Sequence, residues 1–346
     1  MPLPRFAPIL ARLAPVLALA ALVLSTVLFE QVFREPDQRA FLKPENLLNI
    51  LRQAAPVGVI AVGMTFVIIS GAIDLSVGAL TALAAGLGIM TLDALIRRDY
   101  APGTSIGAAL AVMLLAGAAG GAVNGTLVWL GRIPPFIATL GTLAAYRSLA
   151  VALADGGNFE PDFTYRSKVA ALGELSFRGI PLGSIDGRLV ILSYPVLIFA
   201  AVAAAGAFLL RRTVYGVQVR ATGDNERAAA YAAIRTGPVR LIAFALAGLT
   251  TGIAALLYSA RMGASVPSST TGLFTELDAI AAVVIGGTQM RGGSGTVLGT
   301  VVGVLVLAVI TNMLSMVGVG GHYQDLVKGG VIIAAALLQR AVARQP

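Results

Sequence analysis

The chain has 346 residues, of which 57% are hydrophobic and only 12% are charged, and its formal net charge is +8. A soluble domain carries about a quarter of its residues as charged side chains, so lipid is the expected solvent of this chain. The chain has no cysteine and one histidine, which excludes disulfide bonds and thiolate metal sites and argues against any protein-built metal site or cofactor.

Ten apolar runs follow one another along the chain and predict an all-α polytopic membrane protein with about ten transmembrane helices in one permease domain, residues 1–346. A simple crossing needs about 20 residues, so the shorter runs predict short or interrupted helices. We interpret the first run as a membrane helix rather than a signal peptide. The runs are residues 8–29, 54–70, 75–96, 105–130, 134–154, 189–210, 238–258, 277–287, 296–316 and 323–338.

The charges between these runs predict the orientation of the chain. The basic residues are mostly arginines in short loops beside apolar runs, which is the positive-inside pattern rather than a nucleic-acid surface. The loop at residues 211–240 is the most basic and is expected in the cytoplasm, together with both termini. We therefore expect a multi-pass protein of a bacterial inner membrane, surrounded by lipid.

The polar gap at residues 155–188 then faces outward. Its glycines, prolines and four scattered aromatic residues predict a small packed cap. This cap is either a docking surface for an outside partner or a cover over the helix ends. The aromatic residues are Phe159, Phe163, Tyr165 and Phe177.

A first polar constellation, around Asp74, separates two apolar runs. A carboxylate at membrane depth costs about 2.5–3.5 kcal/mol even on lenient insertion scales, so it needs a cause. Asp74 could cap a helix that starts at Leu75 by accepting hydrogen bonds from the amides near Ser76 and Val77. Gly71 would permit the backbone break, which is tolerated only beside protein or a wet cavity. The alternative is that Asp74 lines a translocation path.

A second constellation begins with Glu276 and Asp278, which suit a helix amino terminus because the helix dipole favours negative charge there. Gly286 and Gly287 are expected to end this helix, and a glycine-rich loop follows as far as Gly295. The loop has no Gly-Lys-Ser or Gly-Lys-Thr, so it is not a nucleotide phosphate loop and the chain is not expected to be an enzyme that hydrolyses ATP.

The two constellations resemble each other faintly, as residues 67–71 ahead of Gly78 match residues 283–287 ahead of Gly295. Paired interrupted segments occur in internally duplicated transporters, so a duplication stays open. Asn124 and Thr139 lie inside apolar runs and are expected to hydrogen-bond between helices or to border the path.

The cytoplasmic loop at residues 213–238 is too polar for lipid. It predicts a short helix at residues 226–234 with Asp224 as its cap. Its alanines offer a smooth face that could press into a groove on a partner, or the helix could simply order a long loop.

Three stretches resemble the permease subunits of bacterial ATP-binding-cassette sugar importers of the ribose, xylose and galactofuranose type. They are residues 63–78, 133–142 and 276–299, within a resemblance that covers about residues 46–338. A further stretch resembles the segment of such permeases that touches the ATPase. It comprises Gly223, Asp224, Asn225, Glu226, Ala228, Ala229 and Ile234. Ala72, Ser148 and Ala233 depart from residues common in the family, which weakens any guess about the sugar.

The resemblance implies a permease that moves a monosaccharide-type sugar from periplasm to cytoplasm. A cytoplasmic ATPase would bind the ATP and Mg²⁺, a periplasmic sugar-binding protein would deliver the sugar, and a second permease copy or sibling would complete the path. The rival is a secondary transporter driven by protons or sodium, whose titratable groups would be Asp74, Glu276 and Asp278.

Overall fold

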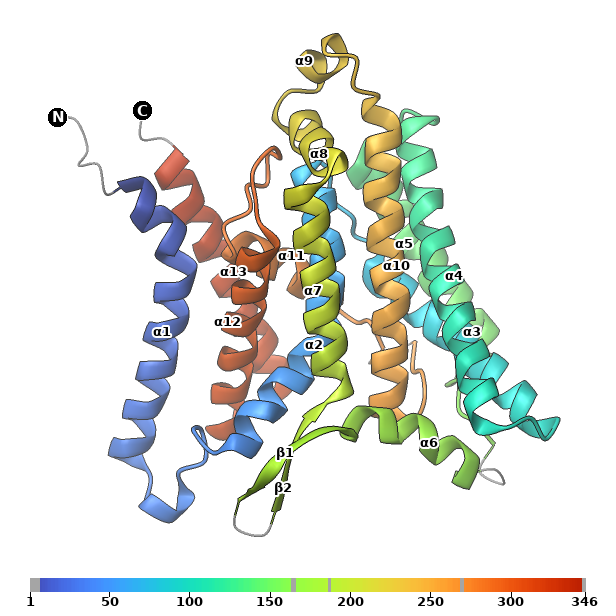
Figure 1. Cartoon of the computed structure of the whole chain (residues 1–346), viewed down its shortest axis with the longest axis vertical. Coiled ribbons are helices and arrows are strands. Elements are labelled where there is room, and N and C mark those ends of the chain that lie inside the picture. Colours follow the sequence, from blue (N-terminus) through green and yellow to red (C-terminus); the bar gives the residue numbers. More distant parts are fainter. Residues whose placement is uncertain (1–6, 163–165, 186–187, 268–270, 344–346) are drawn as a thin grey trace.

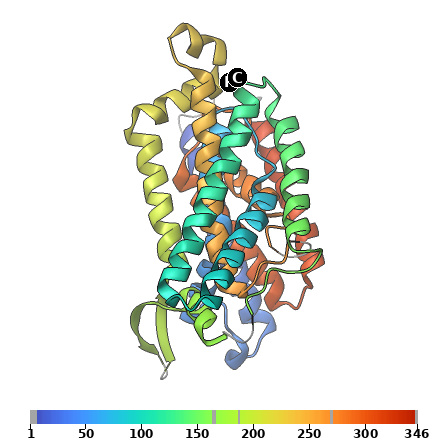
Figure 2. The same ribbon diagram turned by 90° about the vertical axis from the view of Figure 1, so that its right-hand side faces the viewer.

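The computed structural model describes residues 7–162, 166–185, 188–267 and 271–343. Within these residues, the chain forms 13 α-helices, one short 3-10 helix and one β-hairpin. The long helices pack side by side, with the hairpin at one end of the bundle and α8 and α9 at the other (Figures 1 and 2). The predicted all-α polytopic fold is confirmed.

The helices account for each of the ten apolar runs. Eight of the described helices are long and apolar enough to cross a membrane. These are α1 (Ala7–Phe33, from Ala14), α2 (Pro44–Ile69), α3 (Val77–Arg97), α4 (Pro102–Trp129), α5 (Pro135–Leu153), α7 (Tyr194–Arg212), α10 (Thr236–Met262) and α12 (Val297–Met316). The other two runs correspond to α11 (Thr275–Ile285) and α13 (Gly321–Ala343).

Helix α11 is the clearest short element within the bundle. Its 11 residues rise about 16 Å, roughly half of the hydrocarbon thickness of a bilayer. The chain reaches the start of α11 from the hairpin end of the bundle, and the loop after it lies beside α8 (Figure 1). Helix α11 is therefore a half-helix, as the short apolar run predicted.

The hairpin was not expected from the apolar runs. Its strands are β1 (Gly179–Ile185) and β2 (Arg188–Ser193), which pair antiparallel with Gly179 opposite Ser193. The run predicted to be helical from residue 189 therefore begins as a strand, and α7 starts only at Tyr194. Pro195 in the first turn favours this start, because its missing N–H needs no partner there.

The polar gap at residues 155–188, expected to form a packed cap, contains α6 (Arg166–Phe177) and the first strand of this hairpin. Leu172 and Phe159 are buried, and Phe159 packs against Gly86 of α3. Phe177 is 57% exposed, but the Arg52 guanidinium lies over its ring, 4.6 Å from the ring centroid, in a cation–π contact. Phe163 and Tyr165 lie outside the described residues.

The centre of the bundle is α2. From residue 54 to residue 69 it buries every residue except Val57, which is typical of a helix that is apolar on all sides. It packs against α10, α12, α7 and α11. The chain begins α1 and ends α13 at the α8–α9 end of the bundle (Figure 1).

Helices α4 and α10 cross closely through small residues. Gly121 of α4 faces Gly248 of α10 so closely that a Cβ on Gly121 would lie 3.0 Å from the Gly248 Cα and would collide with the Phe244 carbonyl oxygen. Gly117 and Gly252 continue the same contact. Such stripes let helix backbones approach within the membrane.

We expect Gly121→Val to destabilise the protein by about 1–3 kcal/mol or more, because the methyl groups would meet backbone that cannot rotate away. The matched control is Gly107→Val on the same helix, where an added Cβ meets nothing within 4 Å. Melting temperatures of the detergent-solubilised variants measure the difference. Equal melting temperatures would show that the crossing is looser than described.

Candidate functional site

The break between α2 and α3 is held by Asp74. Gly71 adopts φ +80°, a left-handed conformation that L side chains rarely adopt, and turns the chain out of α2. The Asp74 side chain is 1% exposed, and its Oδ1 accepts hydrogen bonds from the backbone N–H (2.8 Å) and hydroxyl (2.7 Å) of Ser76. Helix α3 starts at Val77 with Ser76 as its cap position, so the predicted helix start at Leu75 was wrong. Asp74 orders the turn ahead of the helix instead.

Asp74 belongs to a buried polar cluster of four residues, which we call the aspartate cluster: Asp74, Ser76, Asn124 and Thr142. The Asn124 amide of α4 donates to the Ser76 hydroxyl at 2.7 Å and lies 3.3 Å from Asp74 Oδ2. The Thr142 hydroxyl of α5 donates to Asn124 Oδ1 at 2.7 Å. The cluster therefore ties the broken segment to two neighbouring helices.

Thr139 was expected to hydrogen-bond to a neighbouring helix, but Thr142 makes the shorter bond of this kind. Thr139 is fully buried but donates mainly to the Pro135 carbonyl of its own helix, at 2.9 Å, with a longer contact of 3.4 Å to the Ile73 carbonyl. Thr142 was not predicted as a site residue. Its spacing of three from Thr139 places both on one helix face, which is the signal that could have identified it.

The two carboxylates at the start of α11 point to different neighbours. A Cβ on Gly78 would collide with Oε2 of Glu276, so this carboxylate lies against the first turn of α3. Oε2 is buried and has no hydrogen-bond partner within the described residues. Asp278 instead forms an ion pair with Lys328 of α13, with 3.2 Å between Oδ2 and Nζ.

The loop ahead of α11 is held by Arg147 of α5, which was not predicted as a site residue. Its guanidinium donates to the carbonyl oxygens of Pro267 (2.6 Å), Thr271 (3.1 Å) and Gly272 (3.2 Å). The signal was a single arginine inside an apolar run, where a charge needs a partner. Arg147 thereby sets the position of the half-helix.

The loop after α11 meets the end of α2 at a contact that we call the glycine junction: Gly71, Gly223, Gly292 and Gly293. The Gly293 N–H donates to the Ile69 carbonyl at 2.8 Å. A Cβ on Gly223 would collide with that same carbonyl oxygen and lie 2.7 Å from the Gly293 nitrogen. A Cβ on Gly292 would lie 2.9 Å from the Gly71 Cα. Three segments distant in sequence thus touch backbone to backbone.

Gly286 and Gly287 end α11, as predicted from the sequence. Gly287 has φ +87°, and Gly286 packs so tightly on α12 that a Cβ there would lie 2.7 Å from the Thr300 nitrogen. Helices α11 and α12 therefore pack closely against each other, and the glycine-rich loop connects them.

The polar loop between α7 and α10 forms two helices rather than one. They are α8 (Val214–Asp224) and α9 (Glu226–Tyr231). Asn225 caps α9 by accepting from the Ala228 N–H at 3.0 Å, so the prediction of Asp224 as the cap was wrong. Asp224 ends α8, because the chain becomes extended at Asn225.

Only part of the predicted coupling segment is exposed. Glu226 forms a bidentate ion pair with Arg240 of α10, at 2.7 and 2.9 Å. Ala229 is buried and Ile234 packs against the core, whereas Asp224, Asn225 and Ala228 are exposed. The outer surface also includes Tyr231, which is 92% exposed.

We expect Asp74→Asn to be tolerated much better than Asp74→Leu, because the turn needs an acceptor for the Ser76 donors. The leucine variant would leave the Ser76 donors without an acceptor and the Asn124 amide with the Ser76 hydroxyl alone, at a cost of about 1–3 kcal/mol. Melting temperatures of both solubilised variants test this. An equal loss would favour a role for the negative charge itself.

Comparisons with known proteins agree with this architecture. A family model described as "Branched-chain amino acid transport system / permease component" matches residues 46–336. The ribose import permease of Bacillus subtilis (strain 168) is 38% identical over 301 residues, which cover 87% of this chain and 86% of the relative.

Two relatives from Escherichia coli (strain K12) are similar over comparable lengths. The ribose import permease is 36% identical over 302 residues, covering 86% of each chain. The xylose transport system permease is 33% identical over 373 residues, covering 94% of this chain and 91% of the relative. No solved structure matches the chain. The chain belongs to the family of permease components described for branched-chain amino acid transport systems, in which its curated relatives are permeases for ribose and xylose.

Proposed function

We propose that this chain is the membrane permease subunit of an ATP-binding-cassette importer and moves a monosaccharide into the cytoplasm. The observation that carries the proposal is the identity of 33–38% to ribose and xylose permeases over most of both chains. The family description names amino acids, but the relatives matched over most of their length are named for sugars. A neutral sugar is therefore the favoured cargo.

The α8–α9 end is the proposed contact with a cytoplasmic ATPase, which would bind the ATP and Mg²⁺. This end exposes Tyr231, Val214 (73%) and Val217 (67%) beside polar groups. Large exposed apolar residues rimmed by polar ones are typical of partner surfaces. The arginines of the same loop support a cytoplasmic position in a bacterial inner membrane.

The glycine junction would carry the ATPase's movement into the bundle. Gly223, at the end of α8, packs directly on the Ile69 carbonyl and the Gly293 N–H. The movement would therefore reach the α2–α3 break and the half-helix α11 with no flexible side chain between. ATP need only favour one of two arrangements of these segments to drive alternating access.

The opposite end of the bundle would receive a periplasmic sugar-binding protein. The β-hairpin there exposes Ile180, Leu182 and Leu189, each at least 51% exposed. A second copy of this chain or a sibling permease would complete the translocation path beside it.

The geometry gives less support to a secondary transporter driven by ions. Such a protein needs titratable groups that can exchange their partners along the path. Asp74 is enclosed by Ser76 and Asn124, and Asp278 is paired with Lys328. Glu276 is thus the remaining candidate among those predicted from the sequence.

Uptake into vesicles tests the proposal. We expect uptake of D-ribose or D-xylose to require ATP, the partner ATPase and the binding protein, and to persist when ion gradients are collapsed. In the same vesicles, Tyr231→Glu should lower sugar-stimulated ATP hydrolysis about tenfold or more, because it places a charge at the centre of the proposed interface.

The matched control is Tyr323→Glu, at a tyrosine that is 69% exposed at the start of α13. Glu226 is a poorer probe, since its loss also breaks the ion pair with Arg240. Uptake that follows a proton or sodium gradient without ATP would overturn the proposal. Unchanged hydrolysis in Tyr231→Glu would exclude the α9 surface as the contact.

A further inference from the structure

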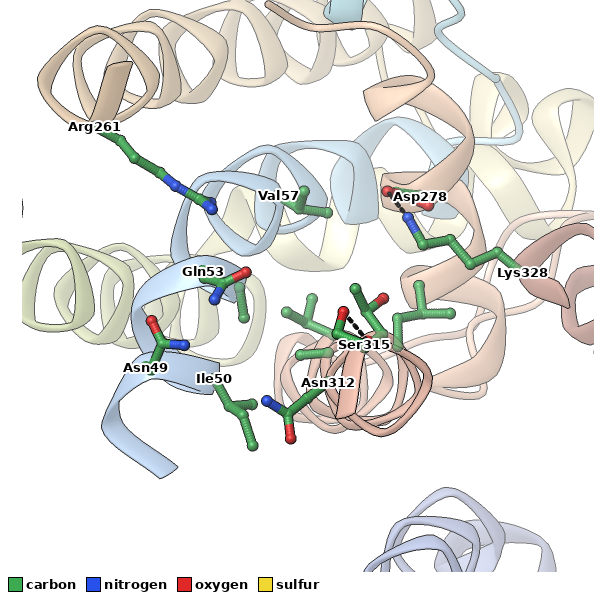
Figure 3. A pocket seen from close by; sticks show the side chains of 14 residues that line it. Asn49, Ile50, Gln53, Val57, Arg261, Asp278, Asn312, Ser315 and Lys328 are labelled. Carbon is green, nitrogen blue, oxygen red and sulfur yellow. Dashed lines mark hydrogen bonds and ion pairs between the residues drawn. The ribbon is translucent and has the colours of Figure 1, made fainter. Parts of the chain in front are cut away.

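A cavity of about 300 Å³ lies among α2, α10, α11, α12 and α13 (Figure 3). It occupies the hairpin half of the bundle, since its lining comes from the first half of α2, the end of α10 and the second half of α12. Its polar lining includes Asn49, Gln53, Arg261, Asp278, Asn312 and Lys328. Aspartate cluster residues do not line it, so the cavity is separate from the helix break.

Several polar groups in this cavity have unused hydrogen-bonding capacity. Within the described residues, neither the Gln53 amide nor the Arg261 guanidinium has a hydrogen-bond partner. Figure 3 shows Arg261 extending from α10 toward α2. Asn49 accepts from Arg52 at 2.8 Å, which leaves its own NH₂ group to donate. These groups can therefore bind a polar ligand without losing protein contacts.

Charges of both signs surround the cavity. Lys328 pairs with Asp278 at 3.2 Å and with Asp325 at 3.3 Å, so its positive charge is already compensated. Arg261 interacts electrostatically with the nearby Arg52, which holds Asn49, and is not paired with a carboxylate of the described residues. A neutral ligand whose hydroxyl groups accept from Arg261 and donate to Asp278 fits this mixed lining.

The rest of the lining combines the hydroxyl groups of Thr311 and Ser315 with apolar side chains, among them Ile50, Val57 and Leu307. A sugar ring presents hydroxyl groups at its rim and C–H groups on its faces. Hydroxyls both donate and accept, so they suit a mixture of cations, a carboxylate and amides. The volume is at the lower end of the range for small-molecule pockets, which suits one sugar ring with water.

We propose that this cavity is a binding site for a single neutral monosaccharide within the permease itself, an inference that rests on the proposed import of sugar. Asp278 connects the site to the rest of the molecule, because α11 carries it and the loop after α11 enters the glycine junction. A shift of that loop would move Asp278 relative to Lys328. Sugar affinity would then differ between transport states.

Direct binding tests the site. The full-length permease in lipid nanodiscs, without its binding protein, is titrated with D-ribose and with D-xylose by calorimetry. We expect saturable binding of at least one sugar, weakened about fivefold in each of Gln53→Met and Arg261→Met, since each variant removes hydrogen bonds to the ligand. Gln38→Met and Arg98→Met, at exposed residues outside the cavity, are the matched controls.

Melting temperatures near the wild-type value would show that the variants are folded. Wild-type affinity in both cavity variants, or no binding by the wild-type permease, would overturn the site. Sugar uptake by the complete transporter distinguishes failure of the cavity proposal from failure of the importer proposal. ATP-driven uptake with an unchanged half-saturating sugar concentration in both variants would reject the cavity but keep the importer, whereas no sugar uptake by the wild type would overturn both.

Discussion

The structure depends on one backbone hydrogen bond, from the Gly293 N–H to the Ile69 carbonyl. Ile69 is the last residue of α2, so its carbonyl has no partner within its own helix. Gly293 provides that partner from a loop more than 200 positions later in the sequence. Gly223 packs on the same carbonyl, and any side chain there would collide with it. Glycine is therefore required because three backbones meet at one point.

The segments that meet at this point are otherwise held firmly. The aspartate cluster fixes the start of α3 to α4 and α5, and Arg147 fixes the loop ahead of α11. Arg240, near the start of α10, pairs with Glu226 of α9 and lies 3.4 Å from the Ser70 carbonyl. A displacement of α9 would therefore move α2 and α11 as connected bodies rather than bend a loop.

Local patterns in the sequence predicted most of the helices, because each apolar run is a membrane helix or part of one. The half-helix followed from its length, and Gly286 and Gly287 marked its end. Long-range contacts were not predictable: nothing local pairs Gly223 with Ile69 or Thr142 with Asn124. Residues 189–193 were predicted as part of a helix because apolar content does not separate a strand from a helix end. Asp224 and Asn225 are both good caps, and only the backbone geometry at Asn225 decides between them.

Under the proposed function, movement at α9 reaches α11 through the glycine junction. The chain has no cysteine, so spin labels can be attached at Leu277→Cys on α11 and Leu249→Cys on α10. Pulsed electron spin resonance would measure their separation in the complete transporter with and without trapped ATP. We predict two distinct distances in the wild-type background and a single distance when Gly223→Val is added. One unchanged distance in both nucleotide states, with ATP hydrolysis intact, would contradict the account.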